Sequence, residues 1–251
     1  RYAVFLSLNQ SKSIHRLHMF FPRGCSEFPM AMLRDITMTK LYLDILDDRR
    51  KRLFSMLKSF EGEWVLAGGT ALALQIGHRK SIDFDLFSPK PISRTLYHSV
   101  CDVFGEQPVK LVDSEDQLTL TLTSGIEVTF LYYWFPFQFP TISTESIALA
   151  DPRDIAADKA CTLGKRNVWR DYVDLYVILK DGHMTIDDLI VTSEKKFGNE
   201  FSSKLFLEQL SYTDDIHDTA VSFVSRTETA DEMKRFLEQT AIVYAQKVVL
   251  R

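Results

Sequence analysis

The sequence has few cysteines, no long hydrophobic run and little net charge, and each shortage excludes a class of protein. The three cysteines, Cys25, Cys101 and Cys161, stand singly with no C-x-x-C pair, so neither a zinc site nor a disulfide framework is indicated. No apolar run reaches the roughly 18 residues of a membrane-spanning helix. A formal net charge of −4 gives no strong overall attraction to nucleic acid. We therefore expect a cytoplasmic protein that does not bind membranes.

The composition is that of an ordinary globular chain with one large or two small domains. Hydrophobic residues make up 45% and charged residues 25% of the 251 residues, which allows a sizeable buried core. Residues 1–32 differ from the rest, because they hold four basic residues, a single acid and no helical period. We expect them to be a dispensable extension that is either disordered or not native.

The stretch from Trp64 to Ser88 has the most informative pattern in the chain. It reads WVLAGGTALALQIGHRKSIDFDLFS, which indicates a buried strand, a Gly-Gly-Thr turn, a short apolar helix, a basic loop and a second strand. Gly68 and Gly69 have no Cβ, so the chain can turn sharply and a phosphate can approach the main-chain N–H groups. The N-terminus of the helix presents unpaired N–H groups at the same place. Thr70 can either cap this helix or donate its hydroxyl to a phosphate oxygen.

Two carboxylates follow on the second strand. Asp83 and Asp85 are two positions apart, so both side chains project from one face, while Phe84 and Leu86 face the core. Mg²⁺ is commonly held by one or two carboxylates together with substrate phosphates. Each part also has a plain structural explanation, because a Gly-Gly turn is usually only a tight turn and a D-x-D strand is often a solvated face. The order of turn, helix and carboxylates favours a phosphate and metal site.

The same stretch resembles a known family. The segments L-A-G-G-T-A-L-A-L, G-H-R and D-F-D-L-F are similar to the signature of the AbiEii/AbiGii toxin-type nucleotidyltransferases, within the polymerase-β-like nucleotidyltransferase superfamily. The resemblance implies an α+β fold, with a mixed sheet flanked by helices over residues 33–150 and a helical domain over residues 151–251. It also implies a divalent cation, Mg²⁺ or Mn²⁺, on Asp83 and Asp85. The residues expected to hold the NTP are Gly68, Gly69, Thr70, Arg79 and Ser81.

Three more strands are indicated after this stretch. They cover residues 109–112, 118–123 and 126–132. Where the family places a third carboxylate, this chain has Thr129. Glu127 lies two positions earlier and therefore on the same face, so either Glu127 supplies a displaced metal ligand or the strands carry only two acidic ligands. The aromatic run 130–139 either stacks nucleobases or packs in the core.

The second half of the chain has helical patterns. Asp151 is an expected N-cap with proline at the first helical position, and the residues from 154 read DIAADKACTLGKRNVWRDYVDLYVIL. This block resembles the second signature of the same family, a lysine helix followed by an R-D-x-x-D-L helix. The resemblance implies that Lys159 contacts the triphosphate, and that Asp171 or Asp174 orients the nucleotide base or accepts a proton from the acceptor. Taken alone, these residues fit a surface ladder in which Arg170 pairs with Asp174.

Together the patterns predict an enzyme that transfers a nucleoside monophosphate from an NTP to an acceptor hydroxyl, on tRNA-like RNA or on a protein. The resemblance further implies the toxin of a toxin–antitoxin or phage-defence system, with a cognate antitoxin as its partner. Other functions fit the same residues. They are a small-molecule nucleotidyltransferase of the antibiotic-modifying kind, a catalytically weakened nucleotide-binding regulatory module, which Thr129 favours, and a purely structural interaction protein.

Overall fold

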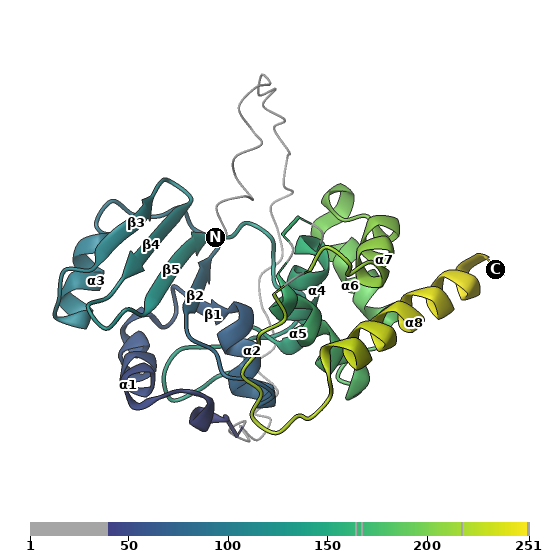
Figure 1. The fold of residues 1–251 in the computed structure, drawn as a ribbon. Helices are drawn as coiled ribbons and strands as arrows, with labels where there is room; N and C mark the ends of the chain where they lie inside the picture. The colour runs from purple at the N-terminus through teal and green to yellow at the C-terminus, as the bar shows by residue number, and fades with distance from the viewer. Residues whose placement is uncertain (1–39, 164, 167, 217, 250–251) are drawn as a thin grey trace, which may run out of the picture. The chain divides into compact units, whose positions relative to one another are not determined.

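A mixed five-stranded sheet flanked by helices forms the described part of the molecule (Figure 1). The computed structural model describes residues 40–163, 165, 166, 168–216 and 218–249, which belong to one compact unit. The expected extension, residues 1–32, lies outside the described residues. The strands are β1 (Val65–Ala67), β2 (Phe84–Ser88), β3 (Val109–Asp113), β4 (Gln117–Thr121) and β5 (Glu127–Tyr132). This architecture confirms the predicted α+β fold.

Helices precede, interrupt and follow the sheet. The α-helices are α1 (Asp48–Met56), α2 (Gly68–Ile76), α3 (Leu96–Phe104), α4 (Pro152–Thr162), α5 (Trp169–Lys180), α6 (Ile186–Phe197), α7 (Ser203–Ser211) and α8 (Ala230–Val249). Short 3₁₀ helices are η2 (Leu43–Ile45), η3 (Leu57–Phe60) and η4 (Gly198–Glu200). The predicted N-cap of α4 is confirmed, because the Asp151 side chain accepts a hydrogen bond from the main-chain N–H of Arg153 and proline occupies the first turn.

The two faces of the sheet differ in chemistry. Its strand order is β1-β2-β5-β4-β3, with β2 and β5 parallel and the other neighbours antiparallel. One face is apolar, and there the Phe130 ring packs edge-on against Phe60 and Trp64 at centroid distances of 5.2 and 4.9 Å. The opposite face carries polar residues in a row across β2, β5 and β4 (Asp85, Thr129 and Thr119). Period-two alternation therefore places these three polar side chains on the same face.

The helices of the second half reach back to the glycine turn. α4 and α5 pack against each other and against α2 (Figure 1), so residues from both halves of the sequence surround the loop between α2 and β2. The division of the chain into domains at residue 150 stays a prediction. Within the described ranges, no helix combines the length and apolar character that a membrane span requires.

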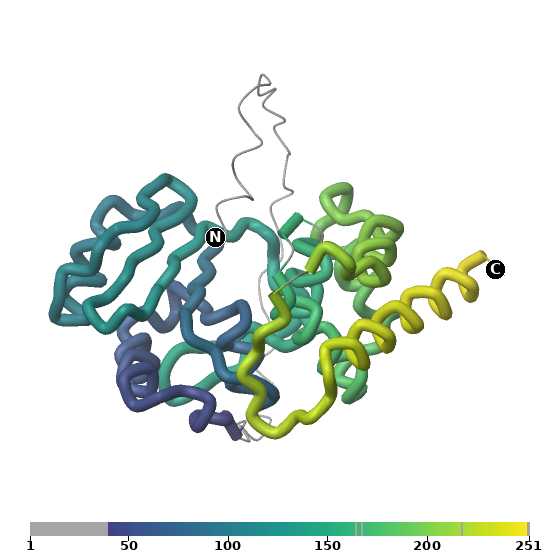
Figure 2. The backbone as a smooth tube through the Cα atoms, in the orientation of Figure 1, coloured from purple at the N-terminus to yellow at the C-terminus, as the bar shows by residue number. Residues whose placement is uncertain are grey.

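The segment between α7 and α8 also contacts this loop (Figure 2). The main-chain N–H of Lys80 donates to the carbonyl of Ser222 at 2.8 Å, and the N–H of Val224 donates to the carbonyl of His78 at 3.1 Å. These two bonds make a short antiparallel bridge between segments far apart in the sequence. We call residues 221–224 the strap.

Candidate functional site

The glycine turn at the start of α2 lies against the second carboxylate. Gly68 has a φ of +65°, a left-handed conformation that residues with a Cβ rarely adopt. A Cβ at this position would lie 2.6 Å from Asp85 Oδ2, so glycine is needed for the turn to approach the carboxylate. The N-cap of α2 is Ala67, whose side chain makes no cap hydrogen bond. The N-terminus of α2, a place where main-chain N–H groups can bind an anion, therefore lies next to Asp85.

Thr70 lies inside α2 and holds the loop that leads to Asp83. Its hydroxyl hydrogen-bonds the Ser81 hydroxyl at 2.7 Å and also the main-chain carbonyl of Asp83. The expectation that Thr70 caps the helix is wrong, because the cap position falls at Ala67. The predicted contacts of Thr70 and Ser81 with an NTP stay predictions.

Asp83 precedes β2 and lies beside β5, whereas Asp85 lies within the strand. Parallel pairing places Asp85 next to Thr129, and Glu127 at the start of β5 lies close enough to Asp83 to affect the pKa of its carboxyl. Burial raises the pKa of Asp83, and the negative charge of Glu127 raises it further. The positive charges of Arg170 and Arg50 act in the opposite direction. Asp85 thus lies on the polar face of β2 and a third acid is close to Asp83, while the shared facing of the two aspartates stays a prediction.

Thr129 occupies the position of the expected third carboxylate and belongs to a row of neutral polar side chains. Thr129 Oγ1 lies 3.2 Å from Thr119 Oγ1, which in turn accepts a hydrogen bond from Gln117 Nε2 at 2.8 Å. All three residues are buried. Across the described ranges, no group of three or more His, Cys, Asp or Glu side chains is arranged to hold a metal ion. The expected metal ligands Asp83 and Asp85, and the part of Glu127 beside them, stay predictions.

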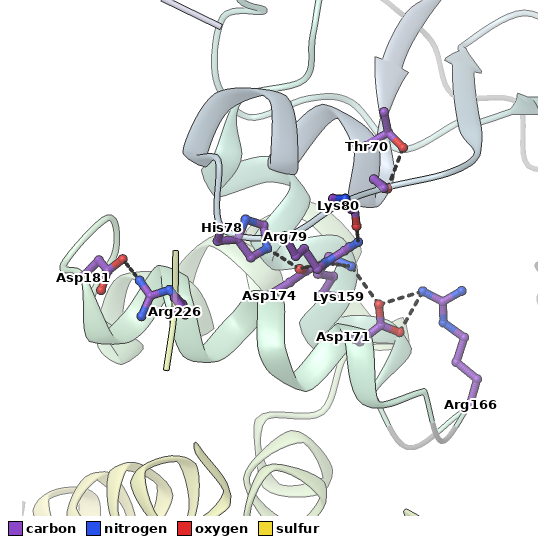
Figure 3. Close-up of polar contacts among 11 residues, drawn as sticks. Thr70, His78, Arg79, Lys80, Lys159, Arg166, Asp171, Asp174, Asp181 and Arg226 are labelled. Carbon is purple, nitrogen blue, oxygen red and sulfur yellow. Dashed lines mark hydrogen bonds and ion pairs between the residues drawn. The ribbon is translucent and has the colours of Figure 1, made fainter. Parts of the chain in front are cut away.

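A buried ionic cluster joins the loop after α2 to helices α4 and α5 (Figure 3). Its centre is Asp174, whose side chain is fully buried. Oδ1 of Asp174 lies 2.7 Å from both His78 Nε2 and Arg79 Nε, and Oδ2 lies 2.8 Å from Arg79 Nη2 and 2.7 Å from Lys159 Nζ. Lys159 Nζ also contacts Asp171 Oδ1 at 2.7 Å, and Arg166 Nη2 lies 2.8 Å from Asp171 Oδ2. We call these six residues the Asp174 cluster.

The cluster keeps Asp174 ionised. Burial alone would raise the pKa of Asp174, but the charges of Arg79 and Lys159, with hydrogen bonds from Arg79 and His78, hold it well below its usual range. Burial lowers the pKa of His78, and the bond to Asp174 opposes this. A buried carboxylate with several donors around it is suited to holding its partners in place.

The surface-ladder interpretation of these charges is wrong. Asp171 and Asp174 do not form a surface ladder with Arg170, because both are buried and Asp174 is occupied by three other side chains. The basic loop lies mostly inside the molecule, since His78 and Arg79 are buried and only Lys80 of the three is exposed. A Cβ at Gly69 would collide with the Arg79 guanidinium, so this glycine makes room for the buried arginine.

Sequence reasoning missed a second buried charge cluster, on the outer side of α4. Lys196 of α6 lies 2.9 Å from Asp154 Oδ1 and 2.7 Å from Asp158 Oδ1, and Tyr133 donates to Asp158 Oδ1 at 2.6 Å. Burial raises the pKa of Asp158, and Lys196 opposes that rise. The sequence did hold one signal for this cluster: Lys196, next to Phe197, falls among the apolar positions of an amphipathic helix, where a lysine needs a buried partner.

The aromatic run 130–139 packs inside the molecule over much of its length. Tyr133 stacks on Phe87 at 4.6 Å and on Phe137 at 6.0 Å, and Phe135 meets Phe197 at 4.8 Å. These contacts support the packing interpretation for those rings. Trp134 is 43% exposed, so it lies partly outside this packing.

Comparisons with known proteins identify the family. Residues 52–242 match the family described as the nucleotidyl transferase AbiEii toxin of type IV toxin–antitoxin systems. An uncharacterised protein of Aquifex aeolicus (strain VF5), aq_aa25, is 28% identical over 191 residues, which are 74% of this chain and 86% of the relative.

Two solved structures from Helicobacter pylori share the fold. One is provisionally described as a nucleotidyltransferase, with a TM-score of 0.50 and 17% identity over 80% of this chain and 97% of its own. The other, JHP933, has a TM-score of 0.50 and 16% identity over 80% and 94% of the two chains. The family match spans both halves of the site, from the glycine turn to α5, and it agrees with the resemblance seen in the sequence. The chain belongs to the AbiEii toxin family of nucleotidyltransferases.

Proposed function

We propose that the protein transfers a nucleoside monophosphate from an NTP to the hydroxyl of an RNA acceptor. The observation that carries the proposal is the approach of Gly68 to Asp85 Oδ2, which leaves no room for a Cβ. It brings the N-terminus of α2 next to the Asp85 carboxylate, and we expect Asp83 to join them in binding a polyphosphate together with a divalent cation.

A divalent cation fits this pair of carboxylates, and its expected ligands are Asp83 and Asp85. Bound there, Mg²⁺ or Mn²⁺ would neutralise the charge that develops on the phosphates. The chain's own groups do the rest. Main-chain N–H groups at Gly68 and Gly69 bind the phosphates, and the Thr70 hydroxyl keeps Asp83 in place through its carbonyl.

The Asp174 cluster supports the second half of the site. Lys159 bridges Asp171 and Asp174, and we assign it the contact with the triphosphate that the family signature implies. Asp171 is the better candidate to accept the proton of the acceptor hydroxyl. Asp174 is held ionised by three partners, so it suits the positioning of Arg79 and Lys159 instead.

The proposed reaction forms a bond between the acceptor oxygen and the α-phosphorus and breaks the bond from that phosphorus to the bridging oxygen. Pyrophosphate leaves with the electron pair, and the acceptor proton passes to a carboxylate or to water. Family membership further supports a toxin role with a cognate antitoxin, and a protein hydroxyl is the other acceptor that we consider.

The test is incorporation of label from each of the four α-labelled NTPs with Mg²⁺, offered in parallel to total RNA, a total protein extract and an aminoglycoside. We expect label in RNA and release of pyrophosphate, both lost in Asp83→Asn. Label in the aminoglycoside would instead identify a small-molecule nucleotidyltransferase. Label in protein alone would exclude RNA as the acceptor.

The neutral residue at Thr129 favours one alternative, a nucleotide-binding regulatory module. Its row of buried hydroxyls supplies no third acidic ligand beside Asp85. This alternative predicts that the wild-type protein binds an NTP and releases no pyrophosphate with any acceptor. Measured turnover in any of the acceptor reactions excludes it.

A further inference from the structure

Arg170 occupies a position that stability does not explain. It lies in the first turn of α5 and is half-buried. A cation there faces the positive end of the helix macrodipole, which costs about 0.3–1 kcal/mol. Within the described ranges, the guanidinium makes no hydrogen bond or ion pair. Its five N–H donors therefore remain open to a ligand.

The face of α5 that carries Arg170 also holds the loop of the candidate site. Arg170 is four residues before Asp174, so the two side chains lie one turn apart on one helix face. Asp174 anchors Arg79 at 2.7 and 2.8 Å, and the chain runs from Arg79 through Ser81 to Asp83. The positive charge of Arg170 accordingly acts on the Asp83 carboxylate.

The other cations near the carboxylates already have partners. Arg79 and Lys159 are tied to Asp174, with side chains only 3% and 6% exposed. Arg50 pairs with Asp47, and its Nε donates to the main-chain carbonyl of Ile82 at 2.9 Å. A phosphate that approached these groups would compete with a carboxylate or a carbonyl, whereas at Arg170 it would displace no acceptor among the described residues.

We propose that Arg170 binds the triphosphate of the NTP and stabilises the charge on the departing pyrophosphate. This inference rests on the proposed function and adds a residue to it. The planar guanidinium donates two parallel hydrogen bonds to non-bridging oxygens of the phosphates. As the bond from the α-phosphorus to the bridging oxygen breaks, the electron pair stays on the pyrophosphate beside Arg170. The proton of the acceptor hydroxyl passes to a carboxylate or to water, as in the proposed reaction.

Binding of inorganic pyrophosphate with Mg²⁺, measured by titration calorimetry, tests this assignment without any acceptor or base preference. We expect Arg170→Ala to weaken pyrophosphate binding about 10–100-fold, the loss that fits removal of charge-assisted hydrogen bonds. Arg170→Lys keeps the positive charge but loses the planar guanidinium, so its affinity for pyrophosphate should lie between those of the wild type and Arg170→Ala. The matched control is Arg235→Ala, an exposed arginine on α8 whose Nε bonds only its own helix at Asp231, which should bind like wild type.

Thermal unfolding and NTP incorporation complete the test. Arg170→Ala should melt at or slightly above the wild-type temperature, because it removes a cation from the helix N-terminus. Wild-type pyrophosphate affinity in Arg170→Ala or Arg170→Lys, with wild-type protein still incorporating label, overturns this inference alone. A variant that binds pyrophosphate normally and loses only turnover also overturns it. If the wild-type protein neither binds pyrophosphate nor incorporates label, the inference and the proposed function fail together.

Discussion

The molecule holds two groups of carboxylates that differ in how their charge is balanced. Asp174 is fully buried and bonded to three side chains, and its pKa lies well below the usual range. Asp83 is half-buried, burial raises its pKa, and Glu127 adds to that rise. The charge of Asp174 is therefore balanced by side chains of the protein itself. The charge of Asp83 is balanced less well, which is the condition expected where a ligand binds.

The largest expected effect comes from a substitution at Asp174, the carboxylate whose charge is balanced inside the protein. Asp174→Asn leaves Arg79 and Lys159 buried without their shared counter-charge, and such a loss costs about 3–5 kcal/mol. We expect the free energy of unfolding, measured in urea, to fall by that amount. Asp102→Asn, an exposed position on α3, is the matched control and should change it by less than about 0.5 kcal/mol. An Asp174→Asn protein of nearly wild-type stability would contradict the assignment of Asp174 to positioning.

The second substitution tests Asp83, the carboxylate whose charge is less well balanced. Asp83→Asn should lower NMP incorporation by about 100-fold or more, because a metal ligand worth several kcal/mol to the transition state is lost. Its free energy of unfolding should stay within about 1 kcal/mol of wild type, because no strong ion pair is broken. Equal loss of stability in Asp83→Asn and Asp174→Asn would remove the distinction between the two groups.

The glycine turn offers a smaller effect with an internal control. Gly68→Ala combines a φ of +65° with a Cβ 2.6 Å from Asp85 Oδ2, and we expect a cost of about 2–3 kcal/mol. Gly125 has a φ of +79° and nothing within 4 Å of its Cβ position, so Gly125→Ala should cost only about 1–2 kcal/mol. Thermal unfolding measures both, and a smaller cost at Gly68 would mean that Asp85 moves aside easily.

The smallest effect concerns pH. A carboxyl whose pKa is raised on folding binds protons more tightly in the folded state. The stability that Asp83 contributes is therefore lost as the pH rises from the pKa of the unfolded state, near 3.8, through the raised pKa of the folded state. Thermal unfolding of the wild type and Asp83→Asn in a chelator should show the wild type losing stability relative to the variant over that window. Because Asp83 is only half-buried, solvent screens the effect to about 1 kcal/mol or less. The lowered pKa of Asp174 acts with the opposite sign, since its contribution is lost below pH 3.8.

Local pattern was enough to predict the fold and the parts of the site that depend on neighbours in sequence. The Asp-Pro pair predicted where α4 begins. The shared facing of Asp83 and Asp85 and the expected nucleotide and metal ligands stay predictions. The partners of Asp174 were not predictable, because His78 and Arg79 lie about a hundred residues away along the chain, and an R-D-x-x-D-L helix fits a solvated ladder equally well. Burial decides between the two, and burial is a property of the packed molecule.

The strap has a consequence for the order in which the site can form during synthesis. Its bonds to His78 and Lys80 are made by Val224 and Ser222, which leave the ribosome long after the glycine turn, the carboxylates and the Asp174 cluster. Until then the main-chain groups of the loop lack this support, although every residue of the candidate site is already present. The nascent chain therefore carries every residue of the candidate site before the strap can add its two main-chain bonds to the loop.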